Sequence, residues 1–158
     1  MVFVTLGTQK QQFSRLLEIL EKSEQLKNEE IIVQAGHTKF ASDHMKILDF
    51  VSLEEMKKYI NEAEYIITHG GVGSIIDSLN MSKKVIAVPR LKEYVEHVDN
   101  HQLEICEKLK EEGYIEVLNE IDNIYNIIEK LKQTEYKKYV SDKSYLEKIE
   151  NVIEELLK

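Results

Sequence analysis

Residues 64–74 read EYIITHGGVGS, a short apolar run that passes directly into a loop with three glycines. The apolar run predicts a buried strand, and the glycines predict a tight turn at its end. The residues that follow predict a helix from about Gly73 to Met81. The stretch therefore predicts a strand, a loop and a helix in immediate succession, which is the repeating unit of sheets with parallel strands.

Similar apolar runs recur along the chain and predict five further strands. They occupy residues 2–6, 31–35, 46–51, 84–88 and 114–117. Helical patterns separate them: one follows Thr8 or Gln9, one opens with a capping box of Ser52 and Glu55, and one covers residues 99–112. This alternation, with most strands apolar throughout, predicts an α/β fold: a Rossmann-like parallel sheet with helices on both faces.

Residues 119–158 differ from the rest, because they are strongly charged and carry only helical patterns. Their apolar residues form two stripes, one of Ile121, Ile124, Ile128 and Leu131 and one of Leu146, Ile149, Val152, Ile153 and Leu156. We expect a Rossmann-like domain over residues 1–118 and a C-terminal helical extension over residues 119–158. The second stripe predicts a helix that packs on the chain's own sheet, on a partner protein, or on both.

The composition limits the possible partners. The chain has 158 residues and a formal net charge of −8. Nucleic-acid-binding domains present a basic face, so this charge argues against a nucleic-acid partner and against direct adsorption to anionic lipid. No apolar run approaches the length of a membrane span, and residues 1–25 lack the pattern of a signal peptide. With Cys106 as the single cysteine, we expect a cytoplasmic protein in which that thiol is a small buried group.

The loop with Gly70, Gly71 and Gly73 has the features of an anion site. Glycines let a ligand approach the backbone closely, and the free N–H groups of a helix start attract negative charge. Ser74 adds a hydroxyl donor, and Asp77 lies one turn further on the same helix face, where its carboxylate can accept from a ribose. The alternative is a tight turn in which the glycines serve packing only. The glycine spacing does not fit the dinucleotide fingerprint, and the chain has no Gly-Lys-Ser/Thr triplet of a P-loop.

A second polar cluster follows the strand predicted at residues 84–88. Because the carboxyl ends of parallel strands share one edge of a sheet, this cluster is expected beside the glycines. Asn100, His101 and Gln102 offer donors and acceptors suited to the hydroxyls of a sugar.

Two alternatives remain open within this cluster. His97, Asp99 and His101 have a spacing that permits a metal site, although no further ligand from elsewhere is evident. Arg90 or Lys92 is either a charge that selects an acidic sugar or a solvated surface charge.

Together these segments resemble the C-terminal domain of glycosyltransferase family 28, whose members have the two-Rossmann-domain GT-B architecture. The resemblance covers the chain from FVTLGT at residues 3–8 to about Leu109. Short, stand-alone versions of this domain are especially similar. They include the catalytic subunit of a eukaryotic two-subunit GlcNAc transferase and small bacterial subunits for exopolysaccharide and capsule assembly, to which EHVDNHQ at residues 96–102 is most similar.

The resemblance implies a nucleotide-sugar site. Its residues would be Gly7, Thr8, Phe50, Val51, His69, Gly70, Gly71, Gly73, Ser74, Asp77, Asn100, His101 and Gln102. Gly7 and Thr8 would lie beneath the diphosphate of a UDP-sugar, and Phe50 and Val51 would hold the uracil. Gly71, Gly73 and Ser74 would hold the phosphates, Asp77 would bind the ribose, and His101 and Gln102 would contact the transferred hexose.

The resemblance also implies an inverting reaction with no metal or other cofactor, because the helix dipole and N–H groups stabilise the departing diphosphate. The general base is expected from the half of the enzyme that this chain lacks, with His69 as a weaker local candidate. The missing half implies a membrane-anchored partner subunit that binds a lipid-linked saccharide acceptor. The complex would then lie at the inner face of the cell membrane.

Two interpretations of the function remain. In the first, the chain is the donor-binding subunit of a UDP-sugar hexosyltransferase in exopolysaccharide or capsule synthesis. In the second, it is a non-catalytic subunit that stabilises a partner transferase. A sugar-nucleotide epimerase would need both halves in one chain, which 158 residues do not provide. The sequence does not distinguish galactose, GlcNAc, glucose and glucuronate as the transferred sugar.

Overall fold

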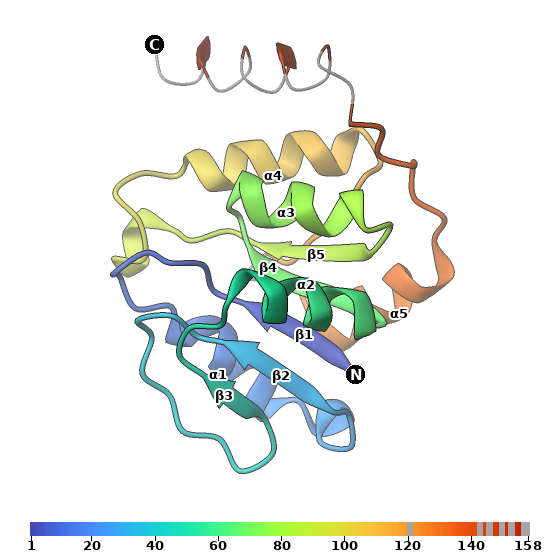
Figure 1. The fold of residues 1–158 in the computed structure, drawn as a ribbon. Helices are drawn as coiled ribbons and strands as arrows, with labels where there is room; N and C mark the ends of the chain where they lie inside the picture. Colours follow the sequence, from blue (N-terminus) through green and yellow to red (C-terminus); the bar gives the residue numbers. More distant parts are fainter. Residues whose placement is uncertain (120–121, 142–143, 145–146, 149–150, 152–153, 156–158) are drawn as a thin grey trace.

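One parallel sheet forms the middle of the molecule (Figure 1). The computed structural model describes residues 1–119, 122–141, 144, 147–148, 151 and 154–155. Within these residues six strands lie in the order β3-β2-β1-β4-β5-β6. The strands are β1 (Val2–Thr5), β2 (Ile31–Gln34), β3 (Lys46–Leu48), β4 (Tyr65–His69), β5 (Lys84–Val88) and β6 (Glu116–Val117). All neighbours pair in parallel, which confirms the predicted sheet.

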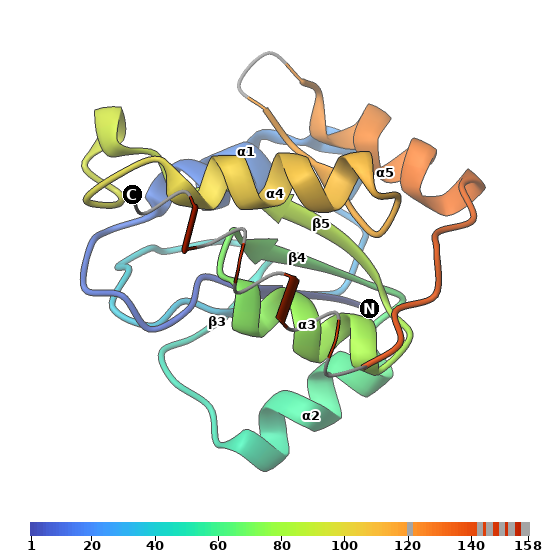
Figure 2. The ribbon, with the colours of Figure 1, turned by 90° about the horizontal axis from the view of Figure 1, so that it is seen from above.

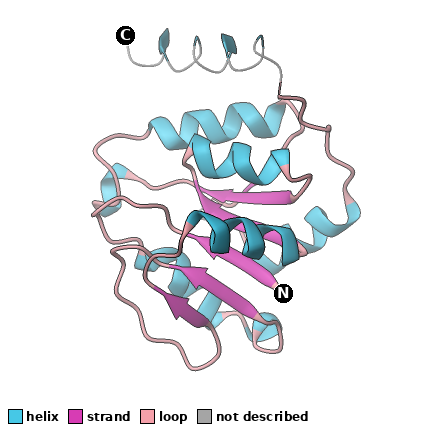
Figure 3. Ribbon diagram, in the orientation of Figure 1, coloured by secondary structure: helices cyan, strands magenta, loops and turns pink. Residues whose placement is uncertain are grey.

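Helices cover both faces of the sheet, as predicted (Figures 2 and 3). Those in the described part of the chain are α1 (Ser14–Lys22), α2 (Leu53–Glu62), α3 (Val72–Asn80), α4 (His101–Glu111) and α5 (Ile124–Gln133). Helices α1 and α5 pack on one face, and α2, α3 and α4 pack on the other. The predicted capping box is confirmed, because the Glu55 backbone N–H donates to Ser52 Oγ and the Ser52 N–H donates to the Glu55 carboxylate.

The strands are apolar throughout because both of their faces are buried. Val2 and Val4 of β1 belong to the core beneath α1 and α5, whereas Phe3 belongs to the core beneath α2, α3 and α4. Alternate side chains of a strand point to opposite faces, so a strand covered on both sides cannot show a polar alternation.

Several predicted boundaries were wrong, and strand β3 ends at Leu48 rather than Val51. Helix α1 begins at Ser14 rather than after Thr8 or Gln9, because the Phe13 backbone N–H donates to Thr38 Oγ at 3.0 Å and residues 7–13 form a loop. Strand β6 is shorter than predicted at its start, because the Tyr114 N–H still donates to the Leu109 carbonyl and closes the end of α4.

The C-terminal extension packs on the domain through its first helix. Ile124, Ile128 and Leu131 of α5 are buried in the same core as α1. Ile121 and the second stripe (Leu146, Ile149, Val152, Ile153 and Leu156) lie outside the described residues, so the role of that stripe stays a prediction. None of the helices in the described ranges combines the length and apolar character needed to cross a bilayer.

The strand order places a switch point between β1 and β4. From β1 the chain continues outward to β2 and β3, whereas from β4 it continues the other way to β5 and β6. Connections that diverge in this manner leave a crevice at the carboxyl ends of the two central strands, where open α/β sheets bind their ligands. We call the loops that follow the strands on this side the carboxyl edge.

Candidate functional site

At the centre of the carboxyl edge, the His69 ring lies between two glycines. A Cβ atom at Gly7 would lie 2.6 Å from His69 Nε2, and a Cβ atom at Gly71 would lie 2.2 Å from the same nitrogen. Gly7 also has φ = +75°, a left-handed conformation that favours glycine. The end of β1 and the loop at residues 69–73, which we call the glycine loop, therefore pack together through one imidazole.

The start of α3 has the geometry of an anion site. Gly71 is its N-cap, and among the described residues no side chain caps the helix and no acidic residue occupies its first turn. A Cβ atom at Gly73 would meet nothing within 4 Å, so the first turn faces open space. Ser74 is half-buried, and Asp77 is exposed one turn further along the helix. The unpaired N–H groups and the positive end of the dipole can therefore receive a phosphate from solvent.

The His69 side chain is buried and neutral. Burial, followed by the nearby charge of Arg90, lowers the pKa of His69 to about 4. Its Nδ1 lies 3.3 Å from Thr68 Oγ1. A base with so low a pKa and so little access accepts a proton poorly at neutral pH, so the structure favours a loop-shaping role over the weaker prediction of a catalytic base.

The predicted sugar cluster lies directly against the glycine loop. A Cβ atom at Gly70 would lie 2.8 Å from Gln102 Cβ and 2.9 Å from Cys106 Sγ, both on α4. Gln102 is buried, and its Oε1 accepts from the backbone N–H of Arg90 at 3.1 Å. Gln102, which is predicted to contact the hexose, thus already uses its side-chain oxygen within the protein. Burial raises the pKa of Cys106 to about 12, which agrees with a small inert side chain.

Asp99 organises the start of α4. Its carboxylate lies 3.1 Å from the Nδ1 atoms of both His97 and His101 and accepts from the His101 N–H at 3.0 Å. Asn100, the N-cap, accepts from the Lys92 N–H through Oδ1. Within the described ranges, no three His, Cys, Asp or Glu side chains are arranged to hold a metal ion. The His101 side chain is one-third exposed.

The predicted uracil residues reach the same edge through Gly36. A Cβ atom at Gly36 would lie 2.5 Å from the Gly7 carbonyl oxygen and 3.6 Å from the Phe50 ring. Phe50 is 52% exposed and packs edge-on against His37, and Val51 beside it is half-buried. Thr8 is exposed. The structure therefore lines up Phe50, Gly36, Gly7, His69 and Gly71 along one edge.

One sequence-based interpretation needs correction. Arg90 is 1% exposed, so it is neither a solvated charge nor a side chain that faces a sugar, whereas Lys92 is exposed. The sequence analysis also missed its neighbours, Arg15 and Glu96. Both Glu96 carboxylate oxygens accept from Arg15 at 2.8 Å, across 81 residues of sequence. The only sequence signal was a charged residue immediately after a buried strand and Pro89.

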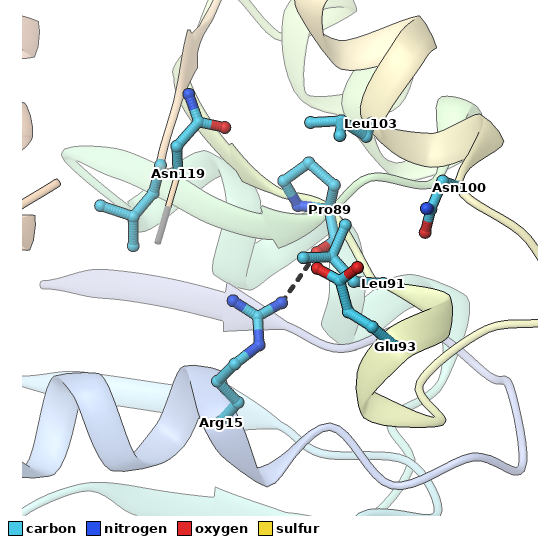
Figure 4. A pocket seen from close by; sticks show the side chains of 8 residues that line it. Arg15, Pro89, Leu91, Glu93, Asn100, Leu103 and Asn119 are labelled. Atoms are coloured by element: carbon cyan, nitrogen blue, oxygen red, sulfur yellow. Dashed lines mark hydrogen bonds between the residues drawn. The ribbon is translucent and has the colours of Figure 1, made fainter. Parts of the chain in front are cut away.

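A cavity of about 310 Å³ lies against the β5–α4 loop (Figure 4). Its walls include Pro89, Leu91, Leu103 and Asn119, and Arg15 donates to the Pro89 carbonyl at its margin. Of the predicted nucleotide-sugar residues, Asn100 lines this cavity, whereas the residues of the glycine loop do not.

Comparisons with known proteins identify the family of the chain. The model of the family described as "Glycosyltransferase family 28 C-terminal domain" matches residues 1–156. The chain is similar to UDP-N-acetylglucosamine transferase subunit ALG13 of Candida albicans, at 37% identity over 75 residues, which are 48% of this chain and 24% of that protein. The human protein of the same name is 29% identical over 125 residues, which are 72% of this chain and 10% of that protein. The chain thus spans a quarter or less of these two relatives.

Solved structures show the same fold. An NMR structure of ALG13 has a TM-score of 0.61 at 22% identity, and covers 94% of this chain and 93% of that one. The calicheamicin glycosyltransferase CalG4 has a TM-score of 0.62 at 13% identity, and covers 84% of this chain and 34% of that one. The parallel sheet with its helices is therefore half of a GT-B fold. Since the family model spans nearly the whole sequence, this chain belongs to the glycosyltransferase family 28 C-terminal domains.

Proposed function

We propose that this chain is the donor-binding subunit of an inverting UDP-sugar glycosyltransferase. The observation that carries the proposal is the open first turn of α3, where Gly73 faces empty space between the row of glycines and the exposed carboxylate of Asp77. A diphosphate on these N–H groups would place a ribose within reach of Asp77. Phe50, exposed at the end of the same row, would lie against the uracil.

The chemistry follows from differential stabilisation of the leaving group. As the acceptor hydroxyl attacks the anomeric carbon, the bond to UDP breaks and negative charge gathers on the β-phosphate. The N–H groups and the dipole of α3 stabilise that charge, so we propose that the reaction needs no metal or other cofactor. The hydroxyl proton goes to a general base on the partner, because His69 is buried and neutral.

The donor and acceptor are proposed from the relatives. ALG13 is named as a subunit of a UDP-N-acetylglucosamine transferase, so UDP-GlcNAc is the first donor to test. We propose a lipid-linked saccharide as the acceptor, in exopolysaccharide or capsule synthesis. The acceptor would be presented by a membrane-anchored partner that holds the complex at the inner face of the membrane.

Exposed apolar side chains support a partner at the carboxyl edge. Five of the six large ones among the described residues lie there, at 47–83% exposure: Phe50, Leu53, Tyr94, Val95 and Val98. They flank the row of glycines on both sides, after β3 and after β5. Apolar groups gathered beside a polar site are typical of a surface that another protein covers.

Calorimetry with UDP tests the proposal on the isolated chain. We expect measurable binding that a chelator does not change and that Gly73→Asp abolishes, because a carboxylate would then occupy the open space at the start of α3. Asn80→Ala, at the exposed end of α3, serves as the control. Gly113→Ala would not, because Gly113 has a positive φ. No binding at millimolar UDP contradicts the proposal.

The alternative, a non-catalytic stabilising subunit, is tested in the assembled complex. Co-expression with the cognate membrane subunit should give transfer from UDP-GlcNAc that Gly73→Asp eliminates. If transfer persists at the parental rate in Gly73→Asp, the chain acts by stabilising its partner and the donor site lies elsewhere.

A further inference from the structure

Arg90 connects segments that are distant in sequence. Its Nη2 donates to the Leu6 carbonyl at 2.7 Å, and its Nη1 donates to the carbonyls of Gln11 at 2.8 Å and Glu96 at 3.3 Å. The guanidinium carbon lies 4.8 Å from the centre of the Phe13 ring, where the π-face attracts a cation. One buried side chain thus joins the end of β1, the β1–α1 loop and the β5–α4 loop.

The backbone of Arg90 extends these contacts to the glycine loop. Its N–H donates to Gln102 Oε1, and Gln102 Cβ lies against the backbone of Gly70. Arg90 therefore contacts, directly or through Gln102, every loop that carries the predicted phosphate and sugar residues. Phe50 and Val51, after β3, lie outside this set of contacts.

The β5–α4 loop that receives Arg90 is itself fixed by charge. Glu96 is 3% exposed, and its carboxylate accepts from Arg15 through two nitrogens and from the Leu91 N–H at 3.0 Å. Arg15 also donates to the Pro89 carbonyl at 2.9 Å (Figure 4). A bidentate pair of this kind has a defined geometry, so the Glu96 carbonyl that faces Arg90 is held in place.

The charges of this network do not cancel. Arg15 and Arg90 contribute two positive charges and Glu96 one negative charge, and the partners of the Arg90 guanidinium within the described residues are carbonyl oxygens. In a chain with a net charge of −8, this leaves a local positive charge behind the glycine loop. The positive charge of Arg90 affects the glycine loop, because it contributes to the low pKa of His69. In a buried setting such a charge favours an anion at the adjacent helix start.

We propose that Arg90, framed by Arg15 and Glu96, is the positioning residue of the donor site and sets the relative placement of the loops that hold a nucleoside diphosphate. Arg90 does not touch the ligand and acts through the loops. A guanidinium is required because it donates in separate directions from one rigid plane, whereas the ammonium of lysine donates from a single point. The inference rests on the proposed function, since it takes the ligand to be a nucleoside diphosphate.

Three variants of the full chain test the inference by UDP titration and thermal unfolding. Arg90→Lys keeps the charge but loses the spread of donors, and Arg90→Met loses both. Leu131→Ala is the matched control, because Leu131 is fully buried in α5 and its carbonyl contacts Lys84 at the start of β5, away from the carboxyl edge. Arg90→Lys is expected to weaken UDP binding by about tenfold or more, and Arg90→Met by more than Arg90→Lys.

The control separates positioning from general destabilisation. Leu131→Ala should lower the melting temperature at least as much as Arg90→Lys yet keep the parental Kd for UDP. Hydrogen exchange should become faster at the amides of residues 8–13 and 91–96 in Arg90→Lys only. A parental Kd in folded Arg90→Lys, or equal losses of affinity in Arg90→Lys and Leu131→Ala, overturns the inference.

If neither Arg90 variant folds, Glu96→Gln tests the inference instead. This isosteric change weakens the pair with Arg15 while keeping the backbone carbonyl that Arg90 uses, and it should weaken UDP binding by about threefold. Parental affinity in Glu96→Gln then contradicts the inference. If the parent chain itself fails to bind UDP, the proposed function fails, which distinguishes that result from binding that the variants leave unchanged.

Discussion

At the carboxyl edge of the sheet, the glycine loop is shaped by missing side chains, whereas the β5–α4 loop beside it is shaped by charged ones. The backbone at Gly70 packs against the Gln102 side chain, and the backbone at Gly71 packs against the His69 ring, more closely than a Cβ atom would permit. The β5–α4 loop closes on the ion pair of Arg15 and Glu96 and on buried Arg90. The glycine loop leaves backbone N–H groups open to a ligand. Arg15, Glu96 and Arg90, which we call the charged frame, fix the position of the loops beside these N–H groups.

The largest expected effect comes from breaking the charged frame. Arg15→Met leaves the Glu96 carboxylate buried, with the Leu91 N–H as its remaining donor among the described residues, so it should lower the free energy of unfolding by about 4 kcal/mol. Urea unfolding measures the loss. The double variant Arg15→Met/Glu96→Gln should recover part of it, because no unpaired charge remains. A loss below about 1 kcal/mol would show that the pair behaves as a solvated surface contact.

The glycine loop should respond to pH through His69. The His69 pKa is lowered from 6.5 to about 4 in the folded protein, so between these values the unfolded chain binds a proton that the folded chain does not. Stability therefore falls as the pH drops from about 6.5 to about 4, by about 3 kcal/mol at most, and the loss stops growing below that range. Unfolding free energies from pH 7 to 4 for the parent and His69→Asn measure this effect. Equal pH slopes for the two proteins would contradict the buried, neutral state.

Two glycines of one loop make a matched pair. Gly71→Ala would put a Cβ 2.2 Å from His69 Nε2, so it should cost about 2 kcal/mol of stability and weaken UDP binding. Gly73→Ala meets open space and lies within α3, so it should change stability by about 0.5 kcal/mol or less, or raise it slightly. Thermal unfolding compares the two. Similar losses would mean that the packing around His69 is looser than the geometry indicates.

Asp77 gives the smallest effect on the fold and separates binding from structure. Its side chain is exposed on α3, so Asp77→Ala should leave the melting temperature unchanged. If it binds the ribose, UDP affinity should fall by about tenfold, or about 1.4 kcal/mol. Titration of Asp77→Ala against Asn80→Ala, exposed at the end of the same helix, measures the difference. Equal affinities would remove Asp77 from the donor site.

The two loops also differ in how far the sequence predicts them. Apolar strands, the glycines and the Ser52–Glu55 capping box are local patterns, because strand periodicity and turn chemistry depend on neighbouring residues. The charged frame joins Arg15 to Glu96 and Arg90 to Leu6 over 81 and 84 residues. Nothing near Arg90 in sequence distinguishes a buried guanidinium from a solvated one, since only the assembled sheet supplies its acceptors.

Residues 7–13 show the same limit. Thr8 and Gln9 precede an amphipathic pattern, so the sequence predicts a helix start there. The structure delays α1 to Ser14, because the Gln11 carbonyl accepts from Arg90 and the Phe13 N–H donates to Thr38. The extra loop is what allows the β1 end to join the charged frame. Tertiary hydrogen bonds here override local helix propensity.

The central claim is that the backbone at the start of α3 binds a nucleoside diphosphate. Two-dimensional NMR of the labelled chain during titration with UDP measures this directly, because each amide reports separately. The amides of Val72, Gly73 and Ser74 should shift most, with a smaller change at Gly7, and α5 should not respond. Unchanged α3 amides at millimolar UDP, or shifts centred on another surface, would contradict the account.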